Sequence, residues 1–181
     1  MRSLCVFCGS RPGARPEYLE LAAALGRELA ARSLELVYGG ASVGLMGRMA
    51  DAALAAGGRV IGVIPRALVD RELAHAGLSE LHVVDTLHER KALMAARADA
   101  FAALPGGVGT LDELFEIITW RVLALHRKPI GLLDPGGYFA PLESLLDHMV
   151  REGFLELQHR QMVVRASSPG ELFDRWQGGT Q

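Results

Sequence analysis

Residues 100–113 read AFAALPGGVGTLDE, and this stretch decides the fold class. Its first five residues are continuously apolar, as in a strand that is buried on both faces of a sheet. Pro105, Gly106 and Gly107 end the strand, and an amphipathic helix is expected from about Leu111 to Leu125. A buried strand that passes through a glycine turn into a helix is the repeating unit of a parallel α/β sheet.

The same unit recurs from one end of the chain to the other. Strand-like apolar stretches are expected at 3–8, 34–38, 59–64, 81–85, 100–104, 130–133 and 162–164. Helical patterns begin near Pro16 and Pro169, and others are expected at about 43–56, 86–97, 111–125 and 141–151. The alternation predicts an α/β fold: a doubly wound, Rossmann-like parallel sheet of about seven strands with helices on both faces. We expect residues 1–181 to form one domain.

Length and composition limit the class of protein. The 181 residues are 50% hydrophobic and 22% charged, with a formal net charge of −2. These values are typical of a globular domain, and the charge does not favour a nucleic-acid or anionic-membrane partner. No uncharged apolar run is long enough to span a bilayer, and residues 1–5 lack a secretory layout. We therefore expect a cytoplasmic protein.

Cysteine, histidine and lysine usage argues against several kinds of site. Cys5 and Cys8 would point to opposite faces of a strand, so we expect buried, inert thiols in place of a disulfide or a zinc site. The six histidines show no metal-ligand spacing. The only lysines, Lys91 and Lys128, each follow an arginine, whereas the lysine of an ATPase phosphate loop follows a glycine. We expect neither a metal nor a cofactor.

Ligands of doubly wound sheets bind where the strands end, so the residues after each strand are the candidates. Residues 39–47 form a glycine turn, but Ala41 replaces the central glycine of a dinucleotide-binding motif, and no carboxylate ends the next strand. NAD is therefore weakly supported. Gly39 and Gly40 remain possible ligand contacts, as do Gly9 and Ser10 after the first strand, with close backbone packing as the equal alternative.

The turn after the fifth strand is the strongest candidate. Gly106, Gly107, Gly109 and Thr110 would leave backbone N–H groups bare at the start of a helix, which suits a phosphate. The competing interpretation is a capping box, with Thr110 as N-cap and Glu113 folded back onto it. A cap does not require three glycines, so the phosphate nest is favoured, and Thr110 could serve both roles.

Charged residues follow the fourth strand, at His88-Glu89-Arg90-Lys91. Cations in the first turns of a helix oppose its dipole, and such a locally unfavourable placement indicates function. Arg90 offers a fork for phosphate or carboxylate, and Lys91 a point charge. On the helix after the glycine turn, the spacing of Glu113, Glu116 and Thr119 forms one polar stripe.

Taken in order, these segments resemble the Lonely Guy (LOG) family of cytokinin riboside 5′-monophosphate phosphoribohydrolases. The resemblance covers nearly the whole chain, and its signature is Glu89-Arg90-Lys91 together with residues 105–113, PGGVGTLDE. It implies hydrolysis of the N-glycosidic bond of an N6-substituted AMP to a free base and ribose 5-phosphate, without metal or cofactor. It also implies a homodimer with the sites at the subunit interface. The lysine decarboxylase label often given to this family is rejected, since nothing here resembles a pyridoxal-phosphate site.

The resemblance also assigns residues. It implies that Arg90 and Glu113 are the catalytic pair. The residues that it implies for substrate binding are Glu72, Arg90, Lys91, Gly107, Val108, Gly109, Thr110, Leu111, Asp112, Glu113 and Thr119. Leu87 and Val108 depart from the usual family pattern near the expected base pocket, and Ala41 departs from it elsewhere, so the preferred base stays open. Glu113 would act as a general base or would stabilise positive charge on the ribose.

Two other functions compete with a cytokinin-type phosphoribohydrolase. One is a nucleosidase for AMP or purine nucleotides in general. The other is a non-catalytic carrier of a phosphate-bearing ligand, of the molybdenum-cofactor carrier type. The presence of both Arg90 and Glu113 favours an enzyme over a carrier. The N6 substituent, the use made of the base and any assembly beyond a dimer are left open.

Overall fold

The computed structural model describes residues 1–69 and 74–178. Within them, seven strands form one parallel sheet in the order β4-β3-β2-β1-β5-β6-β7. The predicted strands are all found, with ends shifted by at most two residues. Their bounds are β1 (Ser3–Phe7), β2 (Glu35–Tyr38), β3 (Val60–Pro65), β4 (Glu80–Val84), β5 (Ala100–Ala103), β6 (Ile130–Leu133) and β7 (Val163–Ala166).

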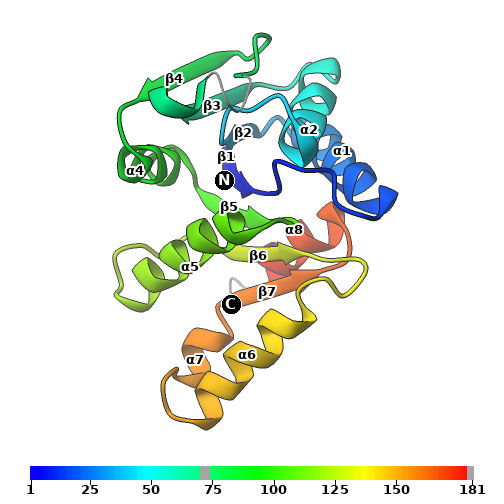
Figure 1. Ribbon diagram of the computed structural model, residues 1–181. Helices are drawn as coiled ribbons and strands as arrows, with labels where there is room; N and C mark the ends of the chain where they lie inside the picture. The colour runs from blue at the N-terminus through cyan, green and yellow to red at the C-terminus, as the bar shows by residue number, and fades with distance from the viewer. Residues whose placement is uncertain (70–73, 179–181) are drawn as a thin grey trace.

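Helices cover both faces of this sheet. Figure 1 shows α1, α2 and α8 on one side, and α4 and α5 on the other. The predicted doubly wound, Rossmann-like α/β fold is therefore confirmed. The short η1 and α7 were not predicted. The bounds are α1 (Pro16–Ala31), α2 (Gly44–Ala55), η1 (Arg66–Leu68), α4 (Leu87–Arg97), α5 (Val108–Val122), α6 (Ala140–Arg151), α7 (Leu157–Arg160) and α8 (Pro169–Gly178).

The order of the strands positions the site. From β1 the chain builds outward through β2, β3 and β4, and it then returns to place β5 on the other side of β1. The loops that follow β1 and β5 therefore leave the sheet toward opposite faces, which opens a crevice between them. Two backbone hydrogen bonds tie these strand ends together: Leu104 N–H to the Phe7 carbonyl (2.9 Å) and Gly9 N–H to the Pro105 carbonyl (3.1 Å).

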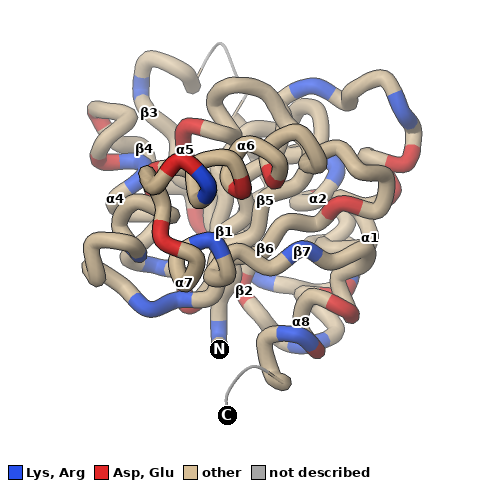
Figure 2. Tube along the Cα trace, turned by 90° about the horizontal axis from the view of Figure 1, so that it is seen from below, with Lys and Arg blue, Asp and Glu red and all other residues tan. Residues whose placement is uncertain are grey.

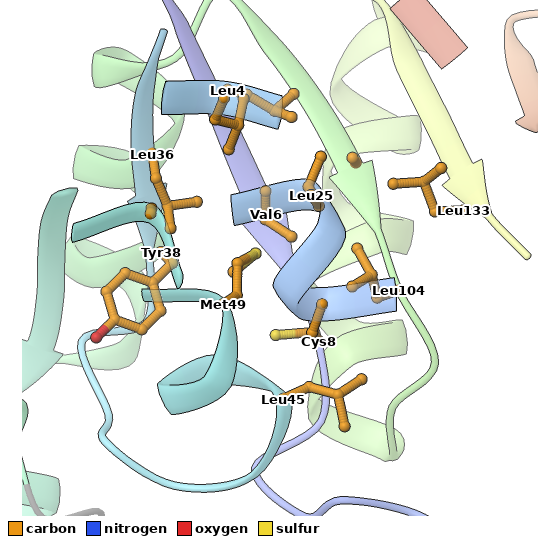
Figure 3. Close-up of a cluster of buried hydrophobic side chains, with 14 of the residues drawn as sticks. Leu4, Val6, Cys8, Leu25, Leu36, Tyr38, Leu45, Met49, Leu104 and Leu133 are labelled. Atoms are coloured by element: carbon orange, nitrogen blue, oxygen red, sulfur yellow. The ribbon is translucent and has the colours of Figure 1, made fainter. Parts of the chain in front are cut away.

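Alternation along β1 divides its side chains between two apolar layers. Leu4, Val6 and Cys8 face α1 and α2, where Figure 3 shows Cys8 beside Leu45. Cys5 belongs to the layer on the opposite face. Both cysteines are buried free thiols, and burial raises the pKa of each well above its usual range. The prediction of buried thiols on opposite faces is confirmed.

The start of α5 corrects one interpretation of the sequence. The helix begins at Val108, three residues before the expected start, with Gly107 as an N-cap in an extended conformation (φ −87°, ψ −158°). Thr110 thus lies inside the helix, and the capping box of Thr110 with Glu113 is wrong. The helix therefore starts within the glycine turn, and the Thr110 side chain lies against Gly106.

Charges are mixed along the chain. Figure 2 shows basic and acidic residues interspersed over the elements that it displays. In the part of the chain that the structure describes, no helix is long and apolar enough to cross a membrane.

Candidate active site

A cavity of about 480 Å³ opens at the carboxyl end of the sheet, where the strand order reverses. Its size suits a small-molecule ligand such as a nucleotide. Its walls are the loop after β1, the starts of α1, α2, α4 and α5, the glycine turn after β5 and the loop after β6. The lining residues are Cys8, Gly9, Ser10, Arg11, Pro12, Gly13, Tyr18, Leu45, Met46, Arg90, Pro105, Gly106, Gly107, Val108, Gly109, Thr110, Glu113 and Tyr138.

The start of α5 presents bare backbone N–H groups to this cavity. The first bond within the helix runs from Leu111 N–H to the Gly107 carbonyl (3.2 Å), and the N-cap residue, Gly107, has no side chain that could cap the helix. The N–H groups of Val108, Gly109 and Thr110 therefore have no acceptor within the helix. The helix dipole adds partial positive charge at the same place. This end of α5 can accordingly hold an anion such as a phosphate.

The glycines of this turn have different structural roles. A Cβ on Gly106 would lie 2.1 Å from Thr110 Oγ1 and 2.8 Å from the Gly9 nitrogen, so the close approach of β1, β5 and α5 requires glycine there. A Cβ on Gly107 or Gly109 would meet nothing within 4 Å. Those two positions leave open space beside the bare N–H groups, which is the room that a ligand needs.

Arg90 reaches the cavity from the first turn of α4, and only 7% of it is exposed. Its Nε donates to the Val63 carbonyl and its Nη2 to the Gly39 carbonyl, both at 3.1 Å. A Cβ on Gly39 would lie 2.1 Å from Nη2, so glycine is required there to admit the guanidinium. Arg90 is thus a cation fixed by a carbonyl within β3 and by the one that follows β2.

Glu113 lies on the second turn of α5 and faces the same cavity. Its charge and that of Arg90 both act on Cys8 at the end of β1. Burial is the main cause that raises the pKa of this thiol, Glu113 raises it further, and Arg90 opposes the change. The cavity therefore combines an anion-binding helix end, a buried guanidinium and a carboxylate. Among the described residues, no three histidine, cysteine or acidic side chains gather as a metal site would require.

Several predicted site residues are held elsewhere in the described part of the chain. Lys91 Nζ pairs with Asp112 (3.1 Å) and Glu116 (3.2 Å), which joins α4 to α5. Burial acts to lower the pKa of Lys91, but the two carboxylates outweigh it and raise that pKa. Thr119 Oγ1 donates to the Phe115 carbonyl (2.7 Å). Leu111, Gly39 and Gly40 also lie outside the lining, as do Lys91, Asp112 and Thr119.

The remaining predictions divide as follows. Gly9, Ser10, Arg90, residues 106–110 and Glu113 come together at the cavity, as the sequence predicts. Glu72 lies outside the described residues.

The sequence interpretation missed part of the wall, above all Tyr18 and Tyr138, whose rings meet edge to face with centroids 5.8 Å apart. The rule that found the other candidates also covers Tyr138, because it follows the end of β6. No candidate was named after the strand expected at 130–133.

Comparison with known proteins places the chain among relatives. Residues 46–176 match the model of a protein family described as "Possible lysine decarboxylase". The cytokinin riboside 5′-monophosphate phosphoribohydrolase LOG7 of Arabidopsis thaliana is 49% identical over 171 residues, which are 94% of this chain and 79% of that protein. The enzyme of the same name from Rhodococcoides fascians is 52% identical over 164 residues, 90% of this chain and 83% of that one. The chain belongs to the LOG family.

Both signature segments of the LOG family contribute to the cavity. Residues 89–91 contribute Arg90, and residues 105–113 contribute the glycine turn and Glu113. Among solved structures, the molybdenum cofactor carrier protein from Chlamydomonas reinhardtii has a TM-score of 0.73 at 20% identity, over 98% of this chain and 96% of that one. This likeness shows the fold alone.

Proposed function

We propose that this protein hydrolyses the N-glycosidic bond of cytokinin riboside 5′-monophosphates to the cytokinin base and ribose 5-phosphate. Relatives that share 49% and 52% sequence identity with it are named for this activity. The observation that carries the proposal is the shared cavity of Arg90, Glu113 and the uncapped glycine end of α5. The proposal includes one domain over residues 1–181 and a cytoplasmic location.

The 5′-phosphate would bind at the start of α5. The N–H groups of Val108, Gly109 and Thr110 offer three donors along the helix axis, and the helix dipole favours negative charge. A nucleoside lacks the group that these donors would bind. This recognition therefore predicts cleavage of monophosphates and little cleavage of nucleosides.

The carboxylate of Glu113 would act on the ribose. As the C1′–N bond breaks, its electron pair leaves with the base and positive charge develops on the ribose. Water then forms the new bond to C1′ and loses a proton, while the departing base gains one. An ionised Glu113 can stabilise the positive charge or accept the proton of the water, and either role requires the charge.

Arg90 would act by position. Its bonds to Val63 and Gly39 already fix the guanidinium, so little side-chain freedom is lost when substrate binds. A fixed cation beside the anion site strengthens the hold on the nucleotide throughout the reaction. It would lower KM as well as support turnover.

A homodimer with its sites at the subunit interface is part of the proposal. Leu87 at the start of α4 and Leu123 and Leu125, which follow the end of α5, are exposed, and exposed apolar side chains suit an interface. Thr119 lies on the same helix as Glu113 but outside the cavity of its own chain. Light scattering of the purified protein should give the mass of two chains.

The test is an assay of the purified protein on N6-isopentenyl-AMP, AMP, adenosine and ADP, with free base and ribose 5-phosphate measured. We expect cleavage of the monophosphates, with N6-isopentenyl-AMP preferred, and almost none of adenosine or ADP. A preference for AMP would support the general nucleosidase instead. Equal cleavage of adenosine and AMP would contradict the phosphate site.

A further inference from the structure

The loop after β6 contacts the glycine turn through one side chain. Tyr138 lines the cavity, and its hydroxyl donates to the carbonyl oxygen of Gly106 at 2.5 Å. This bond joins the loop after β6 to the turn after β5, at the point where α5 presents its bare N–H groups.

Tyr138 is itself held in place from the sheet. Asp134, which directly follows β6 and is only 3% exposed, accepts the N–H groups of Tyr138 (2.6 Å) and Phe139 (2.9 Å). The N–H of Asp134 donates to the Ala166 carbonyl at the end of β7. The Tyr138 ring also packs edge to face against Phe139, whose side chain is buried. The hydroxyl is therefore fixed relative to the sheet.

The bond from Tyr138 determines how one peptide of the turn is oriented. In a trans peptide the C=O and the following N–H point in opposite directions, so a bond to the Gly106 carbonyl also fixes the Gly107 N–H. Glycine stands on both sides of this peptide, so neither flanking residue has a side chain that restrains its rotation. The preceding carbonyl, that of Pro105, is already held by the Gly9 N–H.

The orientation of this peptide matters for an anion. A carbonyl oxygen carries partial negative charge, and one that rotated toward a bound phosphate would repel it. Here the Gly106 oxygen is directed at a hydrogen-bond donor.

We propose that Tyr138 is a positioning residue for phosphate binding: its hydroxyl holds the Gly106–Gly107 peptide in the orientation that lets the start of α5 accept the 5′-phosphate. The inference rests on the proposed function and extends it to a residue outside both signature segments. Phosphate contacts are made in the ground state and in the transition state alike. Their loss raises KM and leaves kcat unchanged.

The test is Tyr138→Phe, which keeps the ring and removes the hydroxyl. We expect the Kd of ribose 5-phosphate by calorimetry and the KM for AMP each to rise about tenfold, the scale of one hydrogen bond. We expect kcat to stay within about twofold, because a substitution that affects only binding leaves kcat unchanged. The inhibition constant of adenosine, which lacks the phosphate, should not change.

Tyr38→Phe is the matched control. It removes another tyrosine hydroxyl that donates to a backbone carbonyl, that of Ala41 (3.1 Å), from a fully buried ring on β2. This variant should melt at a lower temperature and bind ribose 5-phosphate like the unmodified protein.

The outcomes separate the two proposals. If the unmodified protein binds neither AMP nor ribose 5-phosphate, the proposed function is wrong. If it binds and cleaves AMP, and Tyr138→Phe does so with the same Kd and KM, the role of Tyr138 is wrong and the proposed function stands. An equal loss of affinity for adenosine and ribose 5-phosphate would show a merely structural tyrosine and would also overturn the inference.

Discussion

The starts of α4 and α5 have the same local sequence pattern, but the threonine caps the helix at α4 and lies inside the helix at α5. Residues 86–89, TLHE, and residues 110–113, TLDE, each place a threonine three positions before a glutamate. At α4, Thr86 is the N-cap and its Oγ1 accepts the Glu89 N–H at 3.1 Å, while the Glu89 carboxylate accepts the Asp85 N–H at 2.9 Å. At α5 the helix begins before the threonine, and its N-cap is Gly107, which has no side chain to accept an N–H.

The difference shows what an anion site requires of a helix end. The cap at α4 uses its own side chains to satisfy N–H groups, and α8 does the same, with Glu171 N–H donating to Ser168 and Ser167 N–H to Glu171. The pKa of the Glu171 carboxyl is lowered, mainly by the hydrogen bond from the Ser167 N–H and secondly by the hydrogen bond from Arg175. At α5 the helix already begins at Val108, so Glu113 lies in its second turn and lines the cavity.

The largest difference between the two helix starts is expected when the glutamate of each is substituted and kcat is measured. Glu113→Gln removes the charge proposed to act on the ribose, so kcat should fall by a factor of about 100 or more. Glu89→Gln weakens only a cap and should cost about 1 kcal/mol of unfolding free energy with kcat unchanged. Kinetics and urea denaturation of both variants test this. A Glu113→Gln protein that melts early but keeps its specific activity would make Glu113 a structural residue.

The second effect concerns the cation that α4 contributes. Arg90→Ala leaves the carbonyls of Val63 and Gly39 without this donor, so we expect a loss of about 3 kcal/mol in unfolding free energy. The kcat/KM for AMP should fall at least about tenfold, since a charge-assisted contact is lost. Arg97→Ala, at the exposed end of the same helix, is the control and should change stability by only about 0.5 kcal/mol. Equal stability of the two variants would contradict the anchoring of Arg90.

The threonines should respond in opposite ways. Thr86→Ala removes the cap of α4 and should lower the unfolding free energy by about 1 kcal/mol with no change in KM. Thr110→Val keeps the buried shape at the start of α5 and removes a hydroxyl, so KM for AMP should rise about fivefold. If Thr110→Val loses stability like Thr86→Ala and keeps its KM, α5 is capped like α4.

The smallest effect is expected from the ion pairs that join the two helices. The pKa of Lys91 is raised, so the folded protein binds the proton of the Lys91 ammonium group more tightly than the unfolded chain does. The resulting stabilisation is complete below the unfolded pKa of about 10.4 and is lost as pH rises through the folded value. Urea midpoints of the protein and of Lys91→Met, measured from pH 8 to 11.5, should converge at the alkaline end. A constant difference would contradict the pairing with Asp112 and Glu116.

Most of the fold could be predicted because it depends on local patterns. Continuous apolar runs predict strands covered on both faces, and these agree with the structure to within two residues. The start of α5 was predicted wrongly for a physical reason: a threonine followed by a glutamate is a cap at residues 86–89 and lies within a helix at residues 110–113. At α5 the N-cap is Gly107 instead of the threonine, so the helix already includes Thr110.

The site could be predicted in part. The turn at 106–110 and Arg90 could be predicted because each follows soon after an expected strand. The strand end that places them in the cavity is therefore visible in the neighbouring sequence. The contact of Tyr138 with Gly106 could not be predicted, because it joins loops 32 residues apart and depends on how β5 and β6 pair. The pairing of Lys91 with α5 likewise depends on packing between two helices.

The most direct test is a titration of the ¹⁵N-labelled protein with ribose 5-phosphate, followed by the backbone amide resonances at both helix starts. We expect large shifts for the N–H groups of Val108, Gly109 and Thr110, which have no acceptor within α5. We expect no shift for Glu89, whose N–H donates to Thr86. Shifts at the start of α4 with none at the start of α5 would show that the phosphate does not bind at α5.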